Sequence, residues 1–271
     1  MKILPVLYMI LIIVVTGIVF AETADYKTHL AEFKKAEALT NSKTLSSIFQ
    51  ESIAQALTSG NKRNTVFRDK AAGNAREAVA ILDKLVERYP DISKFYSSRS
   101  MAYAVLSSLV PGKRNSLRKQ CIENADKSIE IDPGNIEGYI ALFFVDDDRS
   151  YLETALRIKP DDETANVYYV FSKYVFPSFQ SDSSTLLQYT IGELEKLHNK
   201  FPSNTLVLFS EGILLLKLNN KEQACAVFEK SLQIDENQPA VKILHKALHE
   251  GLANNDKKLY LKDKQEKGAA N

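Results

Sequence analysis

The 271-residue sequence predicts an all-α protein built as a solenoid of antiparallel helix pairs. Three observations predict this fold class. Apolar residues recur at the 3.6-residue period of a helix through most of the chain. Short breaks with Pro, Asn and Asp separate these segments, whereas Gly and Pro are few overall, at ten and eight. One segment, 205–218, is apolar on almost every side, so neighbours on both sides must cover it, as in a stack of repeated units.

The first 21 residues are predicted to be a signal peptide. Lys2 supplies a positive start, residues 3–20 form an apolar run, and Ala21 ends a cleavage site. The run is also about long enough to span a bilayer, so the alternative is an uncleaved anchor over 3–21 in the inner membrane. In either case we expect residues 22–271 outside the cytoplasm, in the periplasm or secreted.

The charge balance argues against nucleic acid as the main partner. The chain carries 35 Lys and Arg against 34 Asp and Glu. A protein that neutralises phosphates needs a surplus of cations. Cleavage of the signal peptide would remove one basic residue and leave the mature chain neutral.

Two helices are predicted in the N-terminal part of the mature chain. Residues 25–40 form a short charged amphipathic helix, inside a segment, 22–43, that we interpret as helix and linker. Residues 44–58 form a second amphipathic helix, which Gly60 ends. We predict one repeat domain over 44–251, followed by a basic, disordered tail at 252–271.

Helices and turns alternate through this domain. Turns are predicted where Pro or a polar residue follows an apolar helix, because the residue before a proline leaves helical geometry. Asp146 to Asp148 are expected to cap the helix that follows them. The predicted helices are 64–88, 94–109, 115–131, 136–145, 164–176, 185–200, 205–218 and 221–234, with a loop at 177–184, a last helix after Pro239, and exit turns at Pro90, Pro133, Pro160, Pro202 and Glu236.

Small and bulky residues alternate in a set order within 205–238. The first helix carries Gly212 and then Leu215, and the second carries Ala224, Phe228 and Ser231. This order resembles a tetratricopeptide repeat, a helix–turn–helix unit of 34 residues. Weaker copies keep an alanine and an exit proline, at Ala125 and Pro133 and at Ala155 and Pro160. The resemblance covers roughly 75–251 and implies a right-handed superhelix whose first helices line a concave groove.

Aromatic residues are the feature with functional content. Ten of the chain's 12 Tyr and 13 Phe fall within 136–179. Core packing explains most of them, but a helix cannot turn every aromatic side chain inward. Tyr is well suited to interfaces, and the resemblance implies that first helices face the groove. We therefore predict that a protein or peptide partner binds Tyr96, Tyr103, Tyr139, Tyr168, Tyr169 and Tyr174.

Two other functions fit the same pattern. The irregular helices could enclose an aromatic-lined pocket for an apolar small ligand, in an accessory subunit that works beside a periplasmic solute-binding or transport protein. Alternatively, the apolar helix 205–218 could join subunits. An open groove, an enclosed pocket or an exposed apolar patch over 206–216 would distinguish the three.

No catalytic or metal-binding constellation is present in the sequence. His245 and His249 are four residues apart on one helix, but no third ligand accompanies them. Cys121 and Cys225 fall in different repeats, too far apart for a disulfide, and we interpret them as packing residues. We expect neither an enzyme, a metal nor a cofactor.

Overall fold

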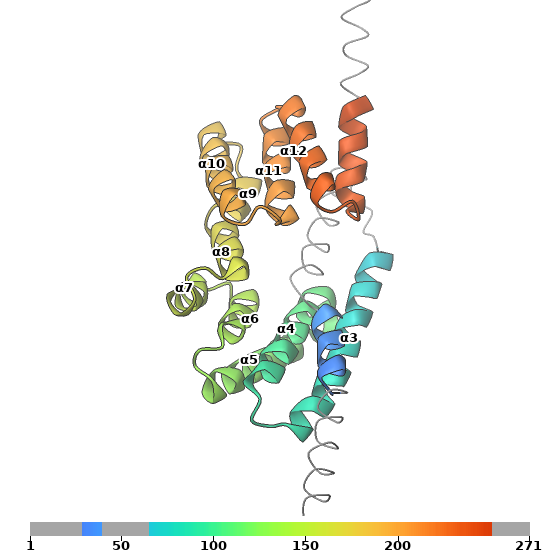
Figure 1. The fold of residues 1–271 in the computed structure, drawn as a ribbon, viewed down its shortest axis with the longest axis vertical. Helices are drawn as coiled ribbons and strands as arrows, with labels where there is room; N and C mark the ends of the chain where they lie inside the picture. The colour runs from blue at the N-terminus through green and yellow to red at the C-terminus, as the bar shows by residue number, and fades with distance from the viewer. Residues whose placement is uncertain (1–28, 40–64, 251–271) are drawn as a thin grey trace, which may run out of the picture. The chain divides into compact units, whose positions relative to one another are not determined.

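The computed structural model describes residues 29–39 and 65–250, and in this part of the chain every regular element is a helix (Figure 1). The predicted all-α class, with antiparallel helix pairs, is confirmed. The predictions for the signal peptide, the helix 44–58 and the tail 252–271 lie outside the described residues. None of the described helices is long and apolar enough to cross a membrane.

The described residues fall into two compact units. Unit 1 contains 29–39 and 72–141, and unit 2 contains 65–71 and 142–250. Each is a set of helices packed around its own apolar side chains.

In unit 1, a helix at 29–39 covers one side of the first long helix. Phe33 and Ala36 are buried against Ala78, Leu82 and Leu85. The described part of the helix predicted at 25–40 is thus helical, and its apolar face is packed. The other helices of unit 1 are α3 (Thr65–Arg88) from residue 72 onward, α4 (Ser93–Leu109), the short η1 (Pro111–Lys113), α5 (Arg114–Ile131) and the first part of α6 (Ile136–Asp146).

Unit 2 continues the alternation of helices and turns. Its elements are the remainder of α6, then α7 (Arg149–Ile158), α8 (Glu163–Val170), η2 (Phe171–Val175), α9 (Phe176–Gln180), α10 (Ser184–Lys200), α11 (Thr205–Lys217), α12 (Lys221–Ile234) and a last helix at 239–250. Asp148 caps α7, as predicted, by accepting a hydrogen bond from the Ser150 N–H at 2.9 Å. That bond lowers the pKa of the Asp148 carboxyl.

All five predicted exit turns follow a helix end. α3, α5, α7, α10 and α12 end at residues 88, 131, 158, 200 and 234. Hydrogen bonds from buried side-chain amides stabilise two of the turns. Asn135 Nδ2 donates to Ser93 Oγ at 2.6 Å, and Gln238 Nε2 donates to the Ser231 carbonyl at 2.8 Å. Because these side chains are buried, each bond satisfies a polar group that would otherwise be costly.

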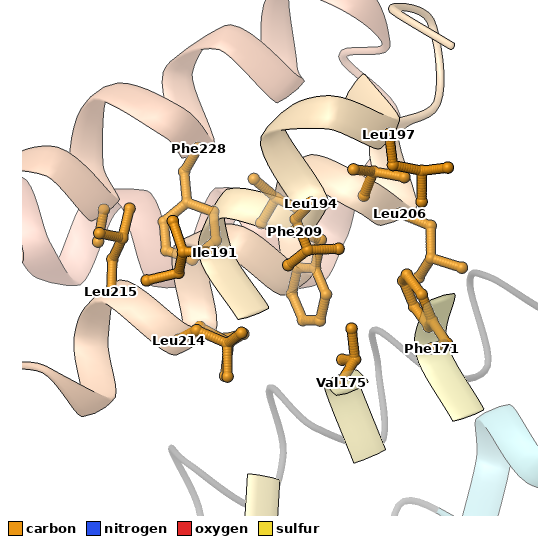
Figure 2. Close-up of a cluster of buried hydrophobic side chains, with 14 of the residues drawn as sticks. Phe171, Val175, Ile191, Leu194, Leu197, Leu206, Phe209, Leu214, Leu215 and Phe228 are labelled. Atoms are coloured by element: carbon orange, nitrogen blue, oxygen red, sulfur yellow. The ribbon is translucent and has the colours of Figure 1, made fainter. Parts of the chain in front are cut away.

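The apolar helix α11 lies at the centre of unit 2. Figure 2 shows Val175 from η2, Leu194 from α10 and Phe228 from α12 pointing toward Phe209 of α11. The Phe209 and Phe228 ring centroids are 6.2 Å apart. The side chains of Leu206, Val207, Leu208, Phe209, Ile213, Leu214 and Leu215 are buried. The apolar patch that subunit joining would require over 206–216 is therefore covered within the chain.

Candidate interaction surface

A turn of π-helix interrupts the helical stretch 163–180. The sequence predicts a helix that stops at Phe176, with a loop from Pro177 onward. The structure corrects this: the chain stays helical to Gln180, through the π turn η2. The Phe176 N–H donates to the Phe171 carbonyl, five residues back. Pro177 explains the wider turn, because it has no N–H for the Lys173 carbonyl and its ring would clash with that carbonyl in a regular α-helix.

Two tyrosines flank a lysine at the π turn. The wider turn changes the register of the side chains that follow it, relative to a regular α-helix. Lys173 Nζ lies 5.3 Å from the centroid of the Tyr169 ring and 5.1 Å from that of Tyr174. Lys173 Nζ also donates to Tyr169 Oη at 3.4 Å. Turns of this kind occur frequently at functional sites.

Tyr189 of α10 extends this face. Its ring meets that of Tyr174 edge to face, with centroids 5.4 Å apart, and 52% of the residue is exposed. Hydrogen bonds from Lys173 and Tyr189 lower the pKa of Tyr174. An ion pair, Lys196 Nζ to Glu193 Oε1 at 2.7 Å, lies on the same helix. We call Tyr169, Lys173, Tyr174 and Tyr189 the tyrosine surface.

A lysine on α11 holds the helix end beside this surface. Lys217 Nζ donates to the carbonyls of Ser178, Phe179 and Ser181, at 3.2, 2.9 and 2.8 Å. These carbonyls terminate α9, where a cation is favourable. Inside the same bend, Ser178 and Thr190 share a buried hydrogen bond of 2.7 Å. The turn between α9 and α10 is thereby fixed from two sides.

The prediction for Tyr168 is corrected. Only 7% of this residue is exposed, and its ring packs edge to face on Phe144 at 4.6 Å between centroids. Burial raises the pKa of Tyr168. The side chain is part of the core of unit 2 and is not accessible to a partner. Tyr169 and Tyr174, by contrast, are partly exposed.

The other three predicted tyrosines lie in unit 1 and are partly exposed. The Arg99 guanidinium lies 5.5 Å from the centroid of the Tyr96 ring and donates to Asp83 Oδ1 at 2.9 Å. Burial and the Asp83 charge raise the pKa of Tyr103. Tyr139 is separate from this group and donates to the Pro133 carbonyl at 3.4 Å. Unit 1 thus has a second aromatic and charged cluster around α4.

Most residues of the repeat signature lie where neighbouring helices pack against each other. A Cβ atom on Gly212 would lie 2.4 Å from Phe228 Cε1, so this position brings α11 and α12 together only as glycine. The buried members are Gly212, Leu215, Ala224, Phe228, Ser231, Ala125 and Ala155, whereas Pro133 and Pro160 are exposed in their turns.

The described residues contain no group of three or more His, Cys, Asp or Glu that could hold a metal ion. The rings of His245 and His249 have centroids 6.2 Å apart. Cys121 is buried, with Sγ 3.1 Å from Ser100 Oγ, and Cys225 is partly exposed. The arrangement of these groups does not point to a reaction.

Sequence reasoning missed Lys173, Tyr189 and Arg99. A search for cations three or four residues from a tyrosine would have found two of them, since Tyr96 and Arg99 are three apart and Tyr169 and Lys173 are four apart. Tyr189 lies on a second helix of a pair, whereas the prediction considered first helices only.

Comparisons with known proteins agree with the helix pairs described above. Two family models, both described as the tetratricopeptide repeat, match residues 207–238 and 66–91. None of the curated proteins matches the chain.

Of three similar solved structures, two are described as TPR proteins, and the description of the third gives its name alone. TTC0263, a thermophilic TPR protein from Thermus thermophilus, is 13% identical, with 66% of this chain and 92% of that one covered and a TM-score of 0.47. YrrB, a TPR protein with an unusual peptide-binding site, is 14% identical, with 71% and 97% covered and a TM-score of 0.36. The MamA RS-1 ArsTM double mutant is 14% identical, with 74% and 99% covered and a TM-score of 0.37.

Proposed function

Because this chain is a tetratricopeptide-repeat protein, we propose that it is a non-enzymatic scaffold outside the cytoplasm that binds a protein partner on its tyrosine surface. The observation that carries the proposal is the π turn at Phe171–Val175. At this turn the Lys173 ammonium lies close to the rings of both Tyr169 and Tyr174, and all three side chains are at least partly exposed. Such a turn departs from regular geometry, and a feature of that kind is expected at sites selected for function.

The composition of the tyrosine surface supports the same proposal. Interfaces between proteins are enriched in Tyr and have aromatic centres with polar rims. Here Tyr174 and Tyr189 form the aromatic centre, and the ion pair between Lys196 and Glu193 lies beside it. Lys217 and the bond between Ser178 and Thr190 hold the backbone nearby. A surface fixed before binding loses less entropy when a partner docks.

Capture from the native host tests the binding. The full chain with an affinity tag is cross-linked in intact cells, purified from the envelope fraction, and its partners are identified by mass spectrometry. We expect a discrete partner with the wild-type chain and its loss with Tyr174→Ala/Tyr189→Ala. The control Ile158→Ala/Ile234→Ala removes two exposed apolar side chains of the same unit, 41% and 40% exposed, and should retain the partner. Equal capture by both double variants would contradict the proposal, and capture of only a small molecule would favour the ligand-handling alternative.

The intact mass of the chain from the same host tests the location. Cleavage after Ala21 would give a protein that begins at Glu22, in the periplasm or the medium. The full mass in a membrane pellet would support the anchor over residues 3–21 instead. A full-length chain in the cytoplasmic fraction would contradict both forms of export.

A further inference from the structure

Lys173 is a cation whose contacts within the described residues are with tyrosines. Its Nζ lies over the rings of Tyr169 and Tyr174, and no carboxylate of the described residues pairs with it. Two other lysines nearby differ in this respect. Lys196 pairs with Glu193 at 2.7 Å, and Lys217 lies 3.8 Å from Asp182. The Lys173 ammonium is exposed, so part of its hydrogen-bonding capacity is available to an anion from outside.

The neighbouring hydroxyl also favours an anionic acceptor. Lys173 Nζ lies 5.1 Å from the centroid of the Tyr174 ring, so the phenol is next to a positive charge. A phenol hydroxyl can donate its proton to an acceptor from outside the chain. Positive charge beside a phenol makes that proton a stronger donor. The ammonium and the phenol therefore present two donors on the same face.

Apolar ring surface lies immediately beside these donors. The Tyr189 ring contacts Tyr174 edge to face and is one of the large apolar side chains that remain exposed in unit 2. A bound group that fits the whole surface must combine an acceptor for Lys173 and Tyr174 with an apolar side chain for Tyr189. A peptide with acidic and aliphatic residues next to each other has both features.

We propose, on the basis of the function above, that the tyrosine surface binds an unmodified acidic segment of a partner protein. One Asp or Glu carboxylate accepts from Lys173 Nζ and Tyr174 Oη, and an adjacent aliphatic side chain packs on Tyr189. A carboxylate matches this surface better than a phosphate group does. A phosphorylated residue carries nearly two negative charges and is usually bound by a cluster of arginines, whereas the tyrosine surface offers one ammonium and neutral phenols.

Synthetic peptides test the chemistry without knowledge of the partner. The probe is fluorescein-labelled Gly-Gly-Leu-Glu-Glu-Leu-Gly-Gly, titrated with the full chain and followed by fluorescence anisotropy at low salt. Its counterparts carry Gln or phosphoserine in place of both Glu residues. We expect the Gln peptide to bind at least about tenfold more weakly than the Glu peptide, since a hydrogen bond to a charged group is lost. The phosphoserine peptide should bind no more tightly than the Glu peptide.

Two matched lysine variants locate the site. Lys173→Gln should weaken the Glu peptide by at least about tenfold, for the same physical reason. Lys246→Gln, which removes an exposed lysine paired with Glu250 on the last helix, should change its affinity by less than about twofold. Equal binding of the Glu and Gln peptides, tighter binding of the phosphoserine peptide, no binding of any probe, or equal effects of the two lysine variants would each overturn the inference.

The capture experiment separates this inference from the proposed function. If the native partner is lost with Tyr174→Ala/Tyr189→Ala but kept at full yield with Lys173→Gln, the scaffold function stands and the acidic segment is wrong. If neither variant changes the capture of the partner, both proposals fail.

Discussion

Gly212 shows how one residue fixes the distance between two helices. The Phe228 ring fills the space above this glycine, and a methyl group there would lie 2.4 to 2.9 Å from three of its ring carbons. Phe228 is itself fully buried, so the ring cannot move into solvent. The sequence pattern identified both residues, and the structure gives the reason: α11 and α12 approach each other through this pair.

We therefore expect Gly212→Ala to destabilise the protein by about 1–3 kcal/mol, the usual cost of overfilling a packed core. Urea unfolding followed by circular dichroism measures the change. Gly192→Ala is the matched control, because a Cβ atom at Gly192 in α10 would meet nothing within 4 Å. That variant should be stabilised by up to about 1 kcal/mol through the higher helix propensity of alanine. Two variants of equal stability would contradict the packing described here.

Glu211 is a partly buried carboxyl whose charge state depends on pH near neutrality. Burial and, secondarily, the nearby charge of Glu195 raise its pKa from 4.5 to about 7, while Lys230 opposes the shift. The folded state therefore binds this proton more tightly than the unfolded state. The resulting stability is fully present below about pH 4.5 and is lost as pH rises through 7.

Glu211→Gln is expected to remove this pH dependence. In urea unfolding, the difference in free energy of unfolding between the variant and the wild type should move in favour of the variant as pH rises from 5 to 8. About half of this change should occur above pH 6. His198, whose pKa burial lowers, contributes a slope of opposite sign in both proteins and cancels in the comparison. A stability difference that stays constant over this range would show that the Glu211 pKa is ordinary.

At the scale of elements, the sequence predicted helix ends better than helix interiors. α12 was predicted at 221–234 and is Lys221–Ile234, because Asn219 and Asn220 precede it and a polar turn follows. Asn219 has a φ of 62°, the left-handed conformation in which asparagine is favoured. Pro177 was interpreted as a stop for the same kind of reason. It produced a π turn instead, since Lys217 and the bond between Ser178 and Thr190 hold the helix beyond it, and contacts this distant in sequence are not visible in a local pattern.

Pro177→Ala tests whether the proline creates the π turn. An alanine restores the N–H that can bond to the Lys173 carbonyl, so the turn should close to a regular α-helix and change the direction of Tyr174 relative to Tyr169. We expect equal or higher thermal stability together with at least about tenfold weaker binding of the captured partner, as expected when the centre of an interface is displaced. Pro202→Ala, at an exit turn away from the surface, should leave binding unchanged. Wild-type affinity in Pro177→Ala would exclude a role for the π turn.

At the scale of the molecule, the sequence predicted the class of fold and the aromatic character of the site, but not which rings are exposed. Tyr168 and Tyr169 are adjacent in the chain, yet one packs on Phe144 and the other contacts Lys173. The two side chains differ in burial because α8 has one buried face. The direction of that face depends on how α8 packs against neighbouring helices. Tyr189 of α10 contacts Tyr174 for the same reason, because the packing of the helices brings the two rings together although they are distant in the sequence.

The most direct test is the affinity of the native partner, once captured, for the wild-type chain and for Tyr174→Ala/Tyr189→Ala. Calorimetric titration with the purified partner gives both dissociation constants, and circular dichroism confirms that the variant is folded. We predict that the double variant weakens binding by at least about 30-fold, since truncated interface aromatics commonly cost about 2 kcal/mol or more. A folded double variant that binds the partner as tightly as the wild type would contradict the claim that this chain acts through its tyrosine surface.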